Sequence, residues 1–149
     1  MEWKEVHTQK DIEFLLQQAG NFHDSCIVSL SYRSGAGVDD ELRMGMGSAQ
    51  QHTLHLVLQR QALPITIELC FSGVRRFFVQ GWQENYFCDL FGCSLTYHHD
   101  LTDKSGEQLI VWTDSPGYDF DELFQQSSLD VPAVSFVIAE NLKWRFLEE

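Results

Sequence analysis

The sequence predicts an α+β fold, built from a bent antiparallel β-sheet of about seven to eight strands and an N-terminal amphipathic helix. Apolar residues follow the 3.6-residue period of a helix in only one clear stretch, near the start of the chain. They then alternate with the two-residue period of strands, and the connections are too short for the helical crossovers of a parallel sheet. A sandwich and a half-barrel both satisfy this pattern, within a single domain over residues 1–149.

The helix is expected over residues 8–19. Thr8 can cap its N-terminus in a capping box with Asp11, and Gly20 can end it in the left-handed conformation. One face of this helix is apolar and must pack against the sheet, and its residues are Ile12, Leu15, Leu16 and Ala19.

The alternation of apolar and polar residues predicts the strands, which we expect at residues 26–33, 53–59, 65–72, 74–82, 91–97 and 109–113. Residues 61–64 have the composition of a hairpin connection, and the Gly-rich residues 34–48 have that of a mobile loop. We expect a terminal hairpin, because apolar residues on both sides flank the polar pair Glu140 and Asn141. Residues 119–126 fit one helical turn or a loop.

Acidic residues outnumber basic ones by 22 to 10, which gives a formal net charge of -12 at pH 7. Bulk electrostatics therefore disfavour binding to nucleic acid or to an anionic membrane, since both need a basic surface. The N-terminal residues lack the apolar stretch of a secretory signal, and no apolar run is long enough to span a bilayer. The four cysteines form no C-x-x-C pair, which favours reduced thiols in the cytoplasm.

The histidines and cysteines lack the spacing of a metal site, and we expect neither a metal nor a cofactor. His52 and His55 are three residues apart and would point to opposite faces of a strand. The densest run of possible ligands has a cysteine spacing too long for a zinc knuckle, and consists of Cys88, Cys93, His98, His99 and Asp100. Buried thiols followed by a polar turn are the preferred interpretation.

His23 and Asp24 lie between the expected end of the helix and the first long strand. A histidine beside a carboxylate can act as a general base with its orienting partner. No serine or cysteine nucleophile can be assigned to this pair from spacing. The preferred interpretation is structural: Asp24 and Ser25 would satisfy backbone donors at the helix-to-strand corner.

An acidic segment is the main candidate for function. Residues 105–142 contain no lysine or arginine, and residues 114–130 interleave carboxylates with aromatic side chains. This composition fits an interface for a basic protein partner, with charge for steering and apolar anchors for residence. The candidate partner-binding residues are Asp114, Tyr118, Asp119, Phe120, Asp121 and Glu122. A further acidic stretch at residues 39–41 is a secondary candidate, and the alternative is a solvated face whose aromatics reach into the core.

A small-ligand site is the second functional hypothesis. A concave face of the bent sheet, lined with aromatic and polar groups, would suit a binding module or a minor enzyme. The residues that would line it are His23, Asp24, Trp82, Tyr97 and Trp112. The same aromatic residues would also serve as ordinary sheet core.

Two runs of residues follow the expected helix in the first half of the chain. They are Phe22-His23-Asp24-Ser25-Cys26-Ile27 and Ile67-Glu68-Leu69-Cys70-Phe71-Ser72-Gly73-Val74. In this arrangement the chain resembles small bacterial cytosolic proteins, some of which are grouped with immunity proteins of polymorphic or contact-dependent toxin systems. The resemblance extends to about Trp82. It implies an α+β domain without catalysis that blocks a toxin by binding it, with His23 and Asp24 as structural markers of the fold.

Overall fold

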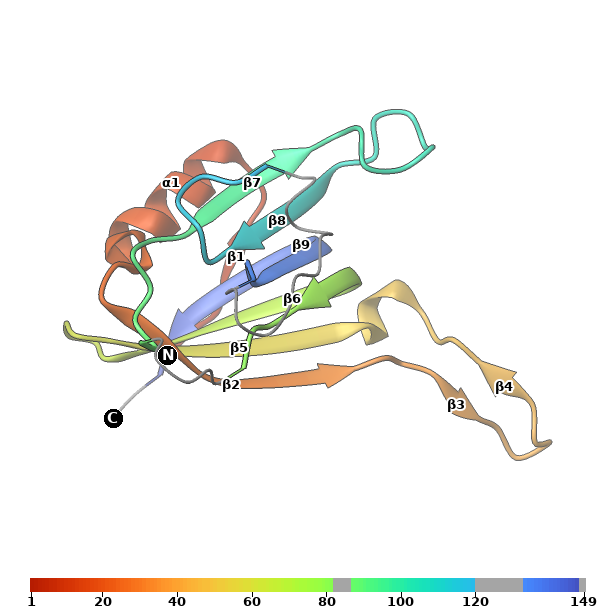
Figure 1. Cartoon of the computed structure of the whole chain (residues 1–149). Coiled ribbons are helices and arrows are strands. Elements are labelled where there is room, and N and C mark those ends of the chain that lie inside the picture. Colours follow the sequence, from red (N-terminus) through yellow and green to blue (C-terminus); the bar gives the residue numbers. More distant parts are fainter. Residues whose placement is uncertain (82–86, 120–132, 148–149) are drawn as a thin grey trace.

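The computed structural model describes residues 1–81, 87–119 and 133–147 (Figure 1). Its one α-helix there is α1 (Gln9–Gln18), which is followed by the 3-10 turn Gly20–Phe22. The strands are β1 (Lys4–Val6), β2 (Ser25–Arg33), β3 (Gly37–Val38), β4 (Met44–Gly45), β5 (Thr53–Arg60), β6 (Thr66–Phe78), β7 (Ser94–His98), β8 (Leu109–Thr113) and β9 (Phe136–Phe146).

Seven of the strands form one antiparallel sheet. Six follow the order β2-β5-β6-β9-β8-β7, and β1 pairs with β9 beyond the point where β8 ends its pairing. The short strands β3 and β4 form a separate two-stranded hairpin. One helix and a mainly antiparallel sheet confirm the predicted α+β class, and the strand pair β5–β6 confirms the hairpin connection at residues 61–64.

The helix begins and ends where the sequence predicts. The Thr8 hydroxyl accepts the Asp11 N–H at 3.3 Å, and the Asp11 carboxylate accepts the Thr8 N–H at 2.9 Å, so the capping box is present. Gly20 adopts a φ of 61° directly after the helix, in the left-handed region that favours glycine. Neither α1 nor any other helix within the described ranges is long and apolar enough to cross a membrane.

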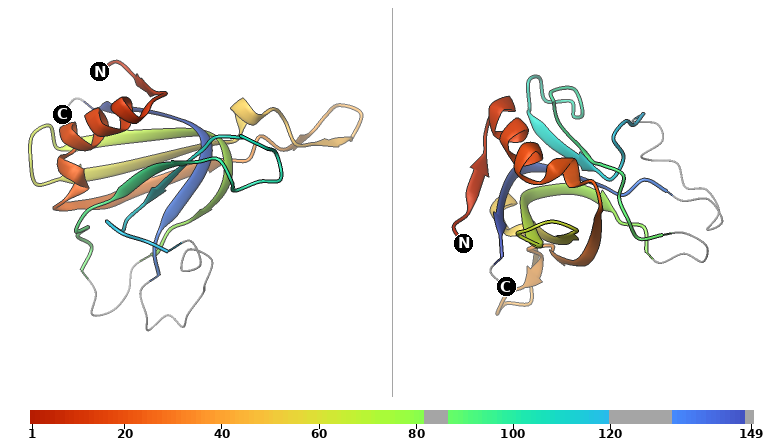
Figure 2. Two further views of the ribbon diagram at one scale, coloured as in Figure 1. Left: turned by 90° about the horizontal axis from the view of Figure 1, so that it is seen from above. Right: turned by 90° about the vertical axis from the view of Figure 1, so that its left-hand side faces the viewer.

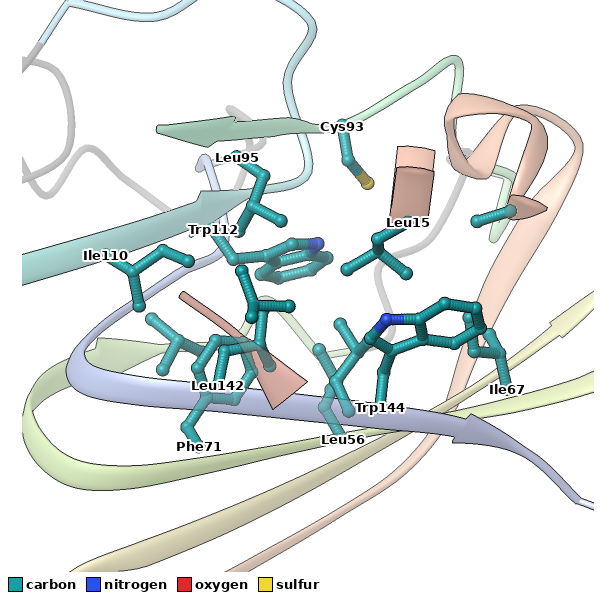
Figure 3. Packing of buried hydrophobic residues seen from close by; sticks show 14 of the residues in the cluster. Leu15, Leu56, Ile67, Phe71, Cys93, Leu95, Ile110, Trp112, Leu142 and Trp144 are labelled. Carbon is teal, nitrogen blue, oxygen red and sulfur yellow. The ribbon is translucent and has the colours of Figure 1, made fainter. Parts of the chain in front are cut away.

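The sheet curves around the side on which α1 lies (Figure 2). Ile12 and Leu15 of the helix are fully buried against this inner face, and Leu15 points toward the rings of Trp112 and Trp144 (Figure 3). Each large apolar side chain buried in this way contributes about 1.5–3 kcal/mol to stability. The inner-face core of the three central strands consists of Leu54, Leu56, Leu58, Ile67, Leu69, Phe71, Leu142, Trp144 and Phe146.

The predicted terminal hairpin is wrong, because β9 continues through Glu140 and Asn141 without a turn. Asn141 pairs with Ser72 of β6, and Ala139 pairs with Val74, so both halves of the segment belong to one strand. The Glu140 carboxylate forms an ion pair with Arg75 at 2.7 Å. Glu140 and Asn141 therefore lie within β9, where Glu140 pairs with Arg75 of β6, and they do not form a bend.

Strand β6 is also longer than predicted, since the segments expected at residues 65–72 and 74–82 join into one strand. The pairing with β9 shifts register between Val74 and Arg76. Gly73 lies directly before this irregularity with a φ of 63°, and a Cβ at this position would lie 2.7 Å from the Glu140 Cβ. Glycine thus allows β6 to pass close to β9 without breaking the sheet.

Other differences concern short or weakly patterned segments. Residues 34–48, expected to form a mobile loop, contain β3 and β4. Strand β1 was not predicted, because three residues are too few to show a period. The strand expected to reach Trp82 ends at Phe78, since residues 79–81 are not in a strand. Trp82 and most of residues 119–126 lie outside the described residues.

We predict that Gly73→Ala lowers the free energy of unfolding by about 2–4 kcal/mol, because it combines an unfavourable φ with a clash against Glu140. Gly106→Ala is the matched control: its φ is also positive, at 76°, but nothing lies within 4 Å of the added Cβ. The control should cost only about 1 kcal/mol. Urea unfolding of both variants checks this, and equal losses would contradict the packing of Gly73 against Glu140.

Candidate functional site

The structure describes three residues of the predicted acidic surface. Asp114 is half-buried at the end of β8, where its Oδ1 accepts the Ser135 N–H at 3.0 Å. The Tyr118 ring is half-buried on a small apolar cluster that includes Val111 and Phe136, and its hydroxyl bonds Thr96 at 2.6 Å. The Tyr118 ring therefore packs against the core, as the alternative interpretation of the acidic segment expects.

The remaining residues of that surface are Asp119 and residues 120–122. Asp119 is exposed, as an interface residue should be. Phe120, Asp121 and Glu122 lie outside the described residues. The acidic-segment interface therefore stays a prediction.

His23 and Asp24 do contact each other, which their adjacent positions made unexpected. His23 Nδ1 lies 3.0 Å from Asp24 Oδ2, and both side chains are more than half exposed. The Asp24 carbonyl accepts the Gln61 N–H, and the Asp24 N–H donates to the Leu90 carbonyl, so backbone groups hold this corner. No serine or cysteine among the described residues bonds to the imidazole, and the structural role of the pair stays a prediction.

Tyr97 and Trp112 of the alternative ligand site both belong to the inner-face core. The Tyr97 hydroxyl and the Trp112 Nε1 are buried and have no hydrogen-bond partner within the described ranges. Burial raises the pKa of the Tyr97 phenol, and the nearby Asp11 raises it further. No hydrogen bond or ring contact in the described structure links these residues to His23 or Asp24. Trp82 lies outside the described residues.

Four exposed apolar residues lie close together on the hairpin of β3 and β4, which projects away from the main sheet (Figure 1). We call residues 35–47 the arm. Its apolar side chains are 60%, 85%, 86% and 75% exposed at Val38, Leu42, Met44 and Met46. Apolar side chains exposed together on a projecting element are typical of a surface that another molecule covers.

The tip of the arm is ordered by one carboxylate. Asp39 Oδ1 accepts the N–H groups of Glu41 and Arg43, both at 2.9 Å, and Asp39 Oδ2 accepts the Arg43 Nε at 3.1 Å. Arg43 also pairs with Glu41 at 3.1 Å. The backbone N–H of Leu42 donates to the Asp39 carbonyl, and Leu42 has a φ of 62°. This network fixes the loop so that Leu42 points into solvent.

The base of the arm is equally defined. Gly35 and Gly47 have positive φ, and a Cβ on Gly35 would lie 3.0 Å from the Cβ of Gln51. The Gln51 side chain accepts the Ser48 N–H at 2.8 Å, and His52 Nδ1 makes a close contact with the Ser34 carbonyl. The arm is thus joined to β5 by close packing and hydrogen bonds.

Sequence reasoning missed the arm as the primary candidate. Its glycines and acidic residues resemble those of a solvated loop, and only residues 39–41 were considered as an additional acidic contact. The arm could have been predicted from the spacing of Leu42, Met44 and Met46, which alternate with arginine and glycine in an otherwise polar stretch. Alternation of this kind is typical of a short strand with one apolar face.

No group of three or more histidine, cysteine or acidic side chains in the described structure could hold a metal ion. His52 and His55 form separate contacts, the first with Ser34 and the second with Glu68. Within residues 87–119, His98 bonds Thr96 and Tyr118. These histidines therefore take part in local hydrogen bonding.

We predict that Asp114→Asn stabilises the fold by about 2 kcal/mol at pH 7.5. Burial raises the pKa of the Asp114 carboxyl to about 6, although its hydrogen bonds with Ser135 act in the opposite direction. A folded-state pKa above the unfolded one means that ionisation destabilises the fold as the pH rises through about 6. The gain should vanish at about pH 2.5, where the carboxyl is protonated in both the folded and the unfolded state.

Urea unfolding at the two pH values measures this effect. Asp103→Asn, at an exposed position, is the control and should give the same stability as the parent at both pH values. A loss of stability in Asp114→Asn at pH 7.5 would show that the carboxylate is favourable in the fold.

Comparisons with protein-family models, with curated proteins and with solved structures gave no match to this chain. The resemblance to immunity proteins therefore stays a prediction. Among the described residues, the arm combines four exposed apolar side chains with a backbone that hydrogen bonds hold in place.

Proposed function

We propose that this protein is a non-enzymatic binding module that inserts its arm into an apolar groove on a basic protein partner. The observation that carries the proposal is the exposure of four apolar side chains on an ordered hairpin, from Val38 at 60% to Met44 at 86%. Because water surrounds these side chains, they contribute no free energy of burial to the stability of the fold. Each would gain about 1.5–3 kcal/mol when a partner buries it fully.

Order in the free arm strengthens the proposal. Binding by a flexible loop costs about 0.5–1.5 kcal/mol for each side chain that becomes immobile, in addition to the backbone entropy. The Asp39 network and the packing of Gly35 on Gln51 already fix the backbone of the arm. Most of this entropy is therefore lost during folding and not on binding.

Charge favours a basic partner. The chain carries a net charge of -12, and the arm tip contributes Asp39, Asp40 and Glu41. Arg43 is engaged by Asp39 and Glu41, so the tip has an acidic surface around an apolar apex. Complementary charge of this kind increases association rates and reduces binding to other acidic proteins.

The arm serves as an anchor and not as the whole interface, because a typical stable interface involves roughly 20–30 residues on each side. The acidic residues 114–130 are our candidate for the additional contact. We propose as the specific form an immunity-type inhibitor, whose partner is a basic toxin domain in the cytoplasm. Toxins that act on nucleic acid are basic for the reason that their substrate is anionic, so an acidic inhibitor is a complementary partner.

A small ligand in the curved sheet is the second candidate. Here the sheet would act as a half-barrel, and the observation that favours this function is that the buried atoms Tyr97 OH and Trp112 Nε1 have no hydrogen-bond partner among the described residues. A ligand with a hydrogen-bond acceptor could accept from either donor. A thermal-shift screen with metabolites tests this function, since a ligand that binds the folded state raises the unfolding temperature.

We predict that a photo-crosslinking benzoylphenylalanine in place of Met44 captures one basic protein in the native host. The same group in place of Leu63, which is 81% exposed in the β5–β6 connection, is the matched control and should not capture it. Leu42→Ser with Met44→Ser should then weaken binding of the captured protein at least about tenfold, as loss of an anchor does. Leu63→Ser should leave the affinity unchanged.

Two results would contradict the proposal. The first is an identical set of adducts from both positions, and the second is an acidic protein as the adduct of position 44.

We also predict that Asp119→Asn, Asp121→Asn and Glu122→Gln together slow association with the captured partner and reduce its dependence on salt. Stopped-flow association at low and high ionic strength measures both quantities. Association at the parent rate would show that residues 119–122 do not contribute to the interface.

A further inference from the structure

The outer face of the sheet, opposite α1, carries a row of polar side chains on three adjacent strands. The register places His55 of β5 opposite Cys70 of β6, and Cys70 opposite Lys143 of β9. In the next row Glu68 of β6 lies opposite Arg145 of β9. These five side chains therefore share one face.

Three of them form a connected chain of hydrogen bonds. His55 Nδ1 lies 2.8 Å from Glu68 Oε1, and His55 Nε2 lies 3.5 Å from Cys70 Sγ. A carboxylate can only accept, so Nδ1 carries the proton and Nε2 presents its lone pair to the Cys70 thiol. Nucleophile, base and orienting carboxylate lie in this order in enzymes that use cysteine.

Glu68 is held firmly in this position. Arg145 donates to Glu68 Oε2 from both Nε and a terminal nitrogen, each at 2.8 Å. Burial alone would raise the pKa of Glu68, but the hydrogen bonds from His55 and Arg145 outweigh this effect and lower it. The carboxylate is thus ionised and can stabilise a positive charge on the imidazole.

Trp3 covers this cluster from the N-terminal side. Its indole lies 4.1 Å from the Arg145 guanidinium carbon, 4.9 Å from Lys143 Nζ and 6.3 Å from the His55 ring. Cys70 lies between His55 and Lys143 in the row and is only 6% exposed. Trp3 itself precedes β1, so its movement would open the cluster without breaking the pairing of that strand.

We propose that Cys70 is a site of S-thiolation by small anionic disulfides, with His55 as the base and Glu68 as the residue that positions it. The Cys70 proton moves to His55 Nε2, and the sulfur attacks one sulfur of the small disulfide. The S–S bond of that disulfide breaks. The products are a mixed disulfide on Cys70 and one small thiol, which takes the proton from His55, so the small disulfide is the only oxidant needed.

The groups around Cys70 explain why the thiol needs a base and why the disulfide that reacts with it is anionic. Burial raises the pKa of the Cys70 thiol, with Lys143 and Arg145 acting against this effect and Glu68 and Glu5 adding to it. The thiol is therefore protonated at rest and needs a base to react. The Lys143 cation is adjacent and favours an approaching carboxylate.

The test uses the full chain with Cys26→Ser and Cys88→Ser, which leaves Cys70 and Cys93. The probes are dithiobis(nitrobenzoate), a dianionic disulfide, and dipyridyl disulfide, which is neutral. Peptide mass mapping assigns each adduct. Cys93 is 8% exposed in the inner-face core, so its labelling reports unfolding and separates loss of fold from loss of chemistry.

We expect the dianionic probe to label Cys70 while Cys93 stays free, and Trp3→Ala to accelerate the reaction. His55→Asn should slow the labelling of Cys70 about tenfold or more, both with Trp3 present and in Trp3→Ala, as removal of a general base does. His99→Asn, at an exposed position, is the matched control and should leave the rate unchanged. Lys143→Ser should reduce the preference for the dianionic over the neutral probe.

Glu68→Gln should slow labelling and move the pH midpoint of the rate to lower pH, because the imidazolium that forms loses its carboxylate. A merely structural loss would leave the midpoint unchanged. The proposal is overturned if Cys70 remains unlabelled even in Trp3→Ala, or if His55→Asn reacts at the parent rate while Cys93 stays protected. Neither result bears on partner binding by the arm, which the crosslinking experiment tests separately.

Discussion

The packing of a single short helix against one face of a wide sheet is the constraint on which the other features depend. Ten residues of α1 extend about 15 Å, whereas six neighbouring strands extend about 24 Å across a flat sheet. A flat sheet would leave much of its apolar face in water. The observed curvature brings Trp112 of β8, Trp144 of β9 and Leu56 of β5 into the same core as Leu15.

Curvature around the helix leaves two regions outside the core. Trp3 packs over the part of the outer face that carries His55, Lys143 and Arg145, where the side chains are charged or hydrogen-bonded. The chain between β2 and β5 continues past the sheet as the arm, where apolar side chains find no core. Stability resides in the inner face, and these two regions are free to carry interactions with other molecules.

Local features were predictable from the sequence, and long-range pairings were not. The capping box of Thr8 and Asp11 depends on residues three apart, so their spacing was sufficient. Glu140 and Asn141 resembled a turn because the partner that retains them in a strand, Arg75, is 65 residues away. The contact of His55 with Cys70 depends on the register of a hairpin, which spacing alone does not give. The arm was concealed by its glycines, whose close packing on Gln51 becomes evident only in three dimensions.

Binding through the arm requires that the Asp39 network already orders the arm in the free protein. Backbone ¹⁵N relaxation of the isolated protein measures this most directly, through the order parameters of residues 39–43. We expect values of about 0.8 or higher, close to those of the rigid sheet. Values below about 0.6 at these residues, with rigid values retained in β5 and β6, would contradict it.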